Sequence, residues 1–325
     1  MPLIIEVKNL KKTYKTHERE PGLINAVKSL VKRKYEFKEA LKSICFEVEK
    51  GEILGLIGPN GAGKSTTLKA LSGVLYPDSG DVNIMGFTPW KDRVKYVKNI
   101  GVVFGQKEQL WWDLPAIDTF YLHKDLYDVD EKDFKKRLDH MVKIMQVEDI
   151  IKTPVRDLSL GERMKCKIIA ALLHNPKLVF LDEPSIGLDV IAKDNLRDFI
   201  KEVNTKYKTT FIVTTHDMQD IERLCKRIII INHGEIIYDG LLKMISERYI
   251  KSKIIDVKFE EKFKNFKFEG CKILEKRTYE LKIELNLKKQ KINTIISYLL
   301  DSFKVADINI SDPSIEEIIK LIYEE

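Results

Sequence analysis

The segment Gly58–Thr66, GPNGAGKST, constrains the fold of this chain more than any other. It matches the pattern GxxxxGK[ST]. It follows an apolar stretch, Glu52–Gly58, that predicts a buried strand, and it leads into Lys64–Ser72, which predicts a helix. Glycines let backbone N–H groups turn inward around phosphate groups, and a helix N-terminus adds partial positive charge. The segment therefore predicts a phosphate-binding loop.

Each part of this loop has a predicted contact with a bound nucleotide. The Lys64 ammonium is expected to reach the β- and γ-phosphates, and the Ser65 hydroxyl is expected to hold Mg²⁺. An ordinary glycine turn between a strand and a helix is the alternative, and the complete pattern in this context argues against it. The predicted nucleotide contacts are Gly58, Pro59, Asn60, Gly61, Ala62, Gly63, Lys64, Ser65 and Thr66.

Two carboxylates follow another apolar stretch, in LVFLDEP, Leu178–Pro184. Asp182, at the end of the predicted strand, is placed to hold Mg²⁺, often through water. Glu183 could polarise the attacking water as a general base. The alternative, two acids that cap the next turn, is weak beside a phosphate loop. Together the two motifs predict ATP hydrolysis.

The rest of the chain predicts an α/β fold. Apolar strands at Lys177–Asp182, Thr209–Thr215 and Arg227–Asn232 alternate with helical stretches, which is typical of a mostly parallel sheet covered on both faces. Residues before about 50 alternate apolar and polar, as half-exposed antiparallel strands do. A helical insert is expected at about 113–175.

After about Leu242 the pattern changes to a small, separate α+β unit. The predicted division is a nucleotide-binding domain at 1–245 and a C-terminal accessory or regulatory α+β domain at 246–325. The second domain has no catalytic constellation, so support of a dimer, regulation and plain stabilisation all stay open.

Composition agrees with a soluble globular chain of about two domains, with 325 residues, 44% apolar and 33% charged. The net charge of +6 is mild and does not by itself argue for nucleic acid. No apolar run approaches the roughly 18 residues of a membrane span, and the N-terminus has no signal-peptide pattern. We expect a cytosolic protein that does not itself cross a membrane.

A third motif is LSLGERMK, Leu158–Lys165. Ser159 followed three residues later by Glu162 predicts a capping box at a helix N-terminus, and the small Gly161 beside it favours an anion site. With the motifs above, the chain resembles the ATPase subunits of ATP-binding cassette (ABC) transporters, whose signature is usually written LSGGQ. Leu160 and Glu162 depart from that pattern.

The resemblance covers about residues 1–242 and implies a phosphate-loop (RecA-like) ATPase core with an antiparallel β subdomain and a helical insert. It also implies two ATPs sandwiched in a dimer, so that Ser159 and Gly161 contact the ATP of a second subunit. Tyr14 matches an aromatic that stacks on adenine. Gln106 matches the glutamine that contacts Mg²⁺ and reports nucleotide state.

Two further positions follow from the resemblance. Ser185–Asp189, SIGLD, resembles the D-loop along the dimer interface, with Asp189 near the nucleotide. His216 resembles the switch histidine that bonds the γ-phosphate and helps hold the attacking water. Alone, such a histidine would more often be a packed one. The implied catalytic set is Glu183, His216 and Gln106, and the implied Mg²⁺ set is Ser65, Gln106 and Asp182.

The resemblance is nearest to exporters whose permeases are separate chains, of a drug- or glycan-exporting kind, and Asp312–Ile322 resembles the close of their C-terminal domain. It implies integral-membrane permease partners and a place on the inner face of the cell membrane. The alternatives are a soluble ABC ATPase acting on nucleic acid or ribosomes, and a small-molecule kinase. The first usually carries a coiled-coil insert or two cassettes, and the second has no use for a signature helix.

Two segments raise predictions about surfaces. Gly22–Lys42 has apolar residues near helical spacing among lysines and arginines, which predicts a basic amphipathic helix. It could meet an anionic membrane or a partner on the permease-facing side, or pack on the β subdomain. Trp111 and Trp112 are adjacent, so one core face can hardly bury both. We expect at least one to form part of the permease dock, unless a loop tucks both into the core of the insert.

Overall fold

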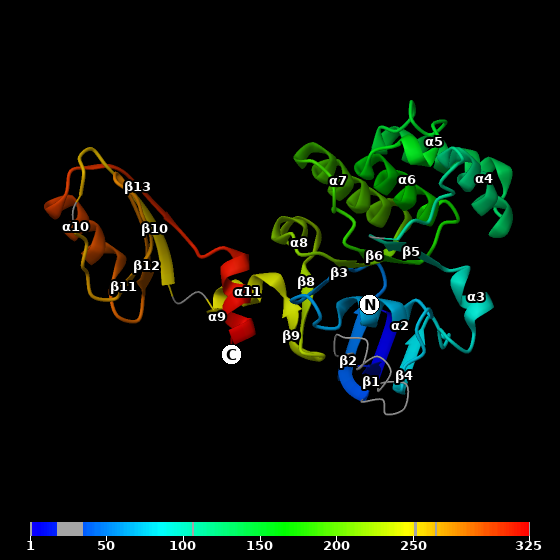
Figure 1. The fold of residues 1–325 in the computed structure, drawn as a ribbon, viewed down its shortest axis with the longest axis horizontal. Helices are drawn as coiled ribbons and strands as arrows, with labels where there is room; N and C mark the ends of the chain where they lie inside the picture. Colours follow the sequence, from blue (N-terminus) through cyan, green and yellow to red (C-terminus); the bar gives the residue numbers. More distant parts are fainter. Residues whose placement is uncertain (1, 18–34, 106, 250–251, 264, 325) are drawn as a thin grey trace, which may run out of the picture. The chain divides into compact units, whose positions relative to one another are not determined.

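The computed structural model describes residues 2–17, 35–105, 107–249, 252–263 and 265–324. These residues form two compact units, Met1–Gly240 and Leu241–Glu325. Among them, no helix combines the length and the apolar character needed to cross a bilayer. Figure 1 shows the order of the elements along the chain.

The centre of the first unit is a six-stranded sheet in the order β5-β6-β7-β3-β8-β9. Its strands are β5 (Ile100–Phe104), β6 (Leu178–Asp182), β7 (Thr210–Thr214), β3 (Ile53–Ile57), β8 (Arg227–Asn232) and β9 (Glu235–Leu241). The pairs β5/β6, β6/β7, β7/β3 and β3/β8 are parallel. Their apolar runs are continuous because both faces are covered, and the predicted α/β core is confirmed.

A three-stranded antiparallel sheet, β2-β1-β4, packs beside this core. It consists of β1 (Leu3–His17), β2 (Tyr35–Glu49) and β4 (Ser79–Ile84). Its apolar side chains share one buried cluster with the parallel sheet, in which Ile5 and Phe46 lie with Leu54 and Phe180. The antiparallel β subdomain is therefore attached to the nucleotide-binding core through a common interior.

The predicted helix at Gly22–Lys42 is wrong for the part that the structure describes. Residues 18–34 lie outside the described residues, but Tyr35–Lys42 belongs to β2. There His17 pairs with Tyr35 and Lys15 with Phe37 across the antiparallel ladder. The Lys15 ammonium lies 3.5 Å from the centroid of the Tyr35 ring. Cross-strand pairing with the long β1 decides the conformation here, which the local spacing of apolar residues could not reveal.

Helices cover the parallel sheet and form the insert. They are α2 (Lys64–Leu71), α3 (Arg93–Val97), α4 (Ala116–Leu126), α5 (Glu131–Met145), α6 (Leu160–Leu172), α7 (Val190–Tyr207) and α8 (Met218–Leu224), with a 3₁₀ turn at Val155–Asp157. In Figure 1, α4, α5 and α6 gather beyond the edge of the sheet formed by β5 and β6. A Cβ on Gly101 would lie 2.3 Å from the carbonyl oxygen of Ala171, so α6 lies directly on β5.

The second unit is an antiparallel sheet in the order β11-β12-β10-β13. Its strands are β10 (Ser252–Phe259), β11 (Cys271–Lys276), β12 (Glu280–Asn286) and β13 (Val305–Ser311). The helix α10 (Ile292–Ser302) covers one face, where Ile295 and Leu299 join the buried cluster. The helices α9 (Leu242–Tyr249) and α11 (Ile315–Glu324) pack against each other.

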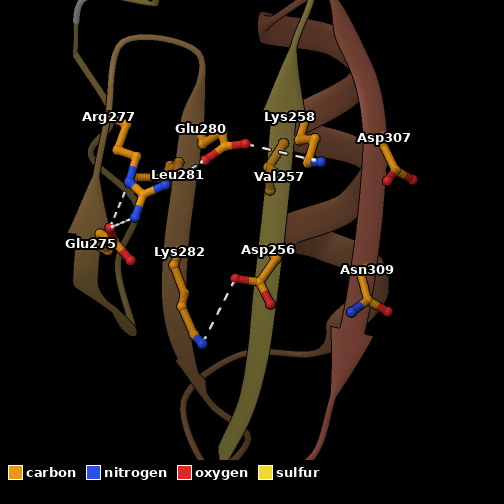
Figure 2. Close-up of a pocket in the computed structure, with 10 residues that line it drawn as sticks. All are labelled: Asp256, Val257, Lys258, Glu275, Arg277, Glu280, Leu281, Lys282, Asp307 and Asn309. Atoms are coloured by element: carbon orange, nitrogen blue, oxygen red, sulfur yellow. Dashed lines mark hydrogen bonds and ion pairs between the residues drawn. The ribbon is translucent and has the colours of Figure 1, made fainter.

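The other face of this sheet carries charged side chains, which line a hollow of about 400 Å³ (Figure 2). The acids and bases pair with one another, both along the chain and across the strands. Arg277 lies 2.7 Å from Glu275, and Lys282 lies 4.0 Å from Asp256. Such alternation of apolar and charged residues is typical of a sheet with one face on a core and one in water.

Candidate nucleotide-binding and hydrolysis site

The phosphate loop links β3 to α2 as predicted. Gly63 precedes the helix with φ +118°, a conformation that L side chains rarely adopt. A Cβ on Gly58 would lie 2.2 Å from the carbonyl oxygen of Ile231, and one on Gly63 would lie 2.7 Å from that of Ala40. These glycines are therefore required because neighbouring backbone approaches the loop closely.

Lys64 is the first residue of α2 and is only 7% exposed. Its ammonium donates to the carbonyl oxygens of Gly58 at 2.6 Å and Pro59 at 3.2 Å. Burial lowers the pKa of Lys64, and the nearby charges of Glu183 and Asp182 oppose that shift. The cation is thus folded over the loop, within reach of phosphates that the loop would hold.

The Asp182 carboxylate at the end of β6 is held by two hydroxyls. Its Oδ1 accepts from the Thr214 hydroxyl at 2.6 Å and from the Ser65 hydroxyl at 3.3 Å. Because parallel strands end at one edge of the sheet, β6 and β7 bring these groups beside the phosphate loop. Asp182 and Ser65 are therefore together, as the sequence predicted. Thr214 was not predicted, although it closes the strand before His216.

Glu183 follows with a left-handed backbone conformation, φ 53°. Such a conformation is uncommon for a residue with a side chain and is often found at functional sites. The Glu183 N–H donates to the carbonyl oxygen of Thr214 at 2.9 Å, which fixes the turn. Its Oε1 lies 3.5 Å from Nδ1 of His216. The structure therefore brings the predicted base and the predicted switch histidine together.

A buried ionic network supports the loop that carries His216. The Arg197 guanidinium in α7 is 2.6 Å from the Asp220 carboxylate in α8, and both residues are almost fully buried. The other Asp220 oxygen accepts from the Thr215 hydroxyl at 3.1 Å. The residue before His216 is thus tied to two helices. Sequence reasoning missed this network because its members are far apart in the chain.

A cavity of about 830 Å³ opens among these groups. Its described lining residues are Asn60, Ser65, Lys69, Phe104, Gly105, Lys107, Asp182, Glu183, Ile186 and His216. Gln106 lies outside the described residues, and its neighbours Gly105 and Lys107 both line the cavity. The cavity therefore joins the phosphate loop, the carboxylate pair and the predicted switch histidine in one site.

Tyr14 is not among the residues that line this cavity. It lies half-buried on β1 opposite Lys38 of β2, and the Lys12 ammonium is 6.0 Å from the centroid of its ring. Ser159, Gly161 and Asp189 are also absent from the described lining, so the structure does not bring these predicted nucleotide contacts together with the phosphate loop.

The signature segment opens α6 with the predicted capping box, which is confirmed. The Ser159 N–H donates to Oε2 of Glu162 at 2.8 Å, and the Glu162 N–H donates to the Ser159 hydroxyl at 3.3 Å. The hydrogen bonds of its carboxylate, first to the Ser159 side chain and then to the Ser159 backbone, keep the pKa of Glu162 below its ordinary value. Glu162 is therefore an acid occupied in capping the helix.

The signature and the segment Ser185–Asp189 touch within this chain. A Cβ on Gly187 would lie 2.3 Å from Cδ2 of Leu160, so Leu160 packs directly over that glycine. A Cβ on Gly161 would lie 3.1 Å from Cδ2 of Leu188. Asp189 caps α7, its Oδ1 accepting from the Ala192 N–H at 2.7 Å.

The two tryptophans lie on the surface of the insert. Trp111 is 55% exposed and Trp112 is 46% exposed, so the alternative that a loop tucks both into the core is wrong. The Arg163 guanidinium lies 5.0 Å from the centroid of the Trp112 ring, a cation–π contact. The Trp112 carbonyl oxygen accepts from the Arg156 N–H at 2.9 Å.

A glycine-rich loop between strand and helix, with a carboxylate pair at the end of a neighbouring parallel strand, defines a phosphate-loop nucleotide hydrolase. Residues 41–186 match the family described as ABC transporter. Over 209 residues the chain is 32% identical to the ABC transporter ATP-binding protein NatA of Bacillus subtilis (strain 168), a match that covers 64% of this chain and 85% of that protein.

The linearmycin resistance ATP-binding protein LnrL of Bacillus subtilis (strain 168) is 29% identical over 290 residues, covering 88% of this chain and 93% of that protein. A solved structure titled a dimeric post-hydrolysis state of the ATP-binding cassette MJ0796 bound to ADP and Pi superposes with TM-score 0.61 at 26% identity, covering 73% of this chain and 98% of that one. This chain belongs to the ATP-binding proteins of ABC transporters. It binds and hydrolyses ATP to power transport, and the alternative of an ATPase acting on nucleic acid or ribosomes is not supported.

Proposed function

We propose that this chain is the energy-coupling subunit of a membrane exporter, bound on the inner, cytoplasmic face of the cell membrane to integral-membrane permease subunits. Export is supported by the resemblance of GQKEQLWWDLPAIDTF and the closing segment to an exporter branch. It is also supported by the likeness to LnrL, whose name refers to resistance. The match spans 290 residues, which is more than the first unit, Met1–Gly240, contains, so it includes part of the C-terminal unit.

The roles of the site residues follow from their chemistry. Backbone N–H groups of Gly58–Thr66 and the Lys64 ammonium bind the β- and γ-phosphates. The oxygens of Ser65 and Asp182, only 3.3 Å apart, are hard donors of the kind that Mg²⁺ takes together with substrate phosphates. Together with Gln106 they would hold Mg²⁺, which would neutralise charge on the phosphates. Tyr14 stacks on the adenine.

The observation that carries the hydrolytic mechanism is the Glu183–His216 pair, 3.5 Å apart at the wall of the cavity. Glu183 orients water and accepts its proton, as a general base within hydrogen-bond reach does. His216 holds the attacking water and contacts the γ-phosphate. The Arg197–Asp220 network keeps the His216 loop in place while the nucleotide changes.

We further propose that Ser159, Gly161 and Asp189 serve the site of a second ATPase subunit. Val190 and Ile191, immediately after Asp189, are 75% and 74% exposed. Adjacent exposed apolar side chains of this size suit a surface that a partner covers. The chain therefore presents one half of each of two composite sites.

Mixing two defective variants tests the composite sites. Lys64→Ala removes the loop cation, and Ser159→Asp keeps a good helix cap but places a carboxylate against the phosphates. A heterodimer of the two holds one intact site, so the mixture is expected to hydrolyse ATP faster than either parent. A mixture that never exceeds its parents would contradict shared sites.

The tryptophans are proposed to receive the permease, since exposed aromatic residues are enriched at interface anchors. Trp111→Ser and Trp112→Ser are expected to leave ATP affinity nearly intact and to reduce co-purification with the permease. Leu126→Ser, at a somewhat more exposed apolar residue of the insert (64% exposed), is the control. Normal permease binding by both tryptophan variants, or unfolding of both, would remove this part of the proposal.

A further inference from the structure

A lysine in the signature helix is buried without any role in ATP chemistry. Lys167 in α6 is only 5% exposed. Its ammonium donates to the carbonyl oxygen of Lys107 at 2.9 Å and lies 3.5 Å from Oε1 of Glu108. A buried ammonium is costly unless such partners satisfy it, so this contact is a built feature of the fold.

The partners of Lys167 belong to the loop that borders the nucleotide cavity. Lys107 lines that cavity, and the Gly105 N–H donates to the carbonyl oxygen of Asp182 at 2.9 Å. The Gln109 amide donates to the carbonyl oxygen of Val102 at 3.0 Å, which fixes the far end of the loop to β5. The Lys107 N–H also donates to the carbonyl oxygen of Phe104 in β5 at 3.1 Å. Lys167 adds the contact that ties this stretch of the loop to α6.

A second cation on the same helix continues the link toward the surface. Arg163 precedes Lys167 by one turn, and its Nη1 lies 3.9 Å from Oε2 of Glu108. Its guanidinium also lies over the Trp112 ring. Positions 159, 163 and 167 share one face of the helix because they are four residues apart. The row thus begins at Ser159 and ends at the cavity loop.

We propose that Lys167 and Arg163 are positioning residues that fix the signature helix to the loop beside the nucleotide, so that ATP binding moves the surroundings of Trp112 and the position of Ser159 together. The consequence of moving Ser159 rests on the proposed function, in which Ser159 contacts the ATP of a second subunit. The link itself lies within one chain.

The test uses fluorescence, because the chain has three tryptophans and a variant can retain one. In a Trp90→Phe, Trp111→Phe chain Trp112 is the only tryptophan, so the tryptophan emission comes from it alone. A non-hydrolysable ATP analogue is expected to change its emission. Lys167→Met is expected to abolish that change while the affinity for the analogue, measured by equilibrium dialysis, stays within about twofold.

Matched variants separate the link from general damage. Lys136→Met, at an exposed lysine of α5, is expected to keep the emission change, and Lys167→Arg is expected to restore part of it. Should Lys167→Met fail to fold, Glu108→Gln weakens the contacts with both cations from a more exposed position and is expected to reduce the change. An emission change retained in Lys167→Met and in Glu108→Gln, or absent from the parent chain, would overturn the inference.

This outcome is independent of the mixing experiment. An emission change that is absent from the parent chain, or that persists in Lys167→Met and Glu108→Gln, would refute the link alone if complementation is intact. Failure of complementation with an intact, Lys167-dependent emission change would refute the shared sites alone.

Discussion

The nucleotide cavity and the hollow on the C-terminal sheet are both lined by acids and bases, yet they hold their charges differently. In the cavity Lys64 is buried against backbone carbonyls, and Asp182 is held by two hydroxyls. On the C-terminal sheet the charges are exposed and pair with one another, as Lys282 does with Asp256 (Figure 2). Charged side chains that are oriented by neighbouring backbone groups and hydroxyls indicate a functional site. Charged side chains that only pair with one another indicate a solvated face.

Replacing one lysine in each region gives the largest expected contrast. Lys64→Ala should weaken ATP binding by about 2–5 kcal/mol, because removing a cation buried against the phosphates leaves their negative charge uncompensated. Lys282→Ala should leave ATP binding unchanged. Equilibrium binding of ATP measures both. Equal losses in the two variants would show that the affinity depends on overall charge rather than on the loop.

The two units should also respond differently to acid. Burial, the first cause, lowers the pKa of His174 to about 4, and the chain has no histidine after Gly240. The neutral His174 stabilises the fold fully above its ordinary pKa of 6.5, and this stability is lost as the pH falls from 6.5 toward 4. The loss should reach about 2 kcal/mol by pH 5.

Hydrogen exchange, corrected for intrinsic rates, measures this loss region by region. Protection should fall around β5, whose Ile100 carbonyl oxygen lies 2.9 Å from Nε2 of His174. Protonation of His174 should not lower the protection of β10 or β12. His174→Phe keeps a ring against Tyr127, with which His174 stacks at 3.9 Å, and should flatten the pH dependence. An unchanged dependence in that variant would assign the effect to other groups.

Local patterns in the sequence predicted the catalytic core well. The strands Ile53–Ile57 and Leu178–Asp182 were placed within one residue at each end, because strands buried on both faces are continuous apolar runs. The capping box was placed because its spacing is fixed by helix geometry. Each of these features is determined by residues close together in the chain.

Features set by distant residues were not predicted. Tyr35–Lys42 forms a strand because β1 extends to pair with it. The Lys167–Lys107 contact joins residues sixty positions apart, and no local periodicity carries such a contact. Likewise, Arg197 and Asp220 come from two different helices, α7 and α8. Tertiary contacts decide these positions, so the sequence of any one segment cannot indicate them.

The smallest expected effect lies on the C-terminal sheet. Lys282→Gln should change the free energy of unfolding by less than about 0.5 kcal/mol, because exposed ion pairs contribute little. The adjacent Leu281 is 1% exposed, so Leu281→Ala should cost about 2–5 kcal/mol and serves as the matched contrast. Urea unfolding measures both. A large effect of Lys282→Gln would indicate that this face is more than a solvated surface.

We propose that the Glu183 carboxylate performs the chemistry while the loop around Lys64 performs the binding. Glu183→Gln keeps the size of the side chain and removes its basicity. We expect this variant to bind ATP as the parent chain does, by equilibrium dialysis, and its phosphate release from ATP to fall by about 10²–10⁴-fold. Turnover near that of the parent chain, with normal ATP binding, would show that Glu183 is not the base.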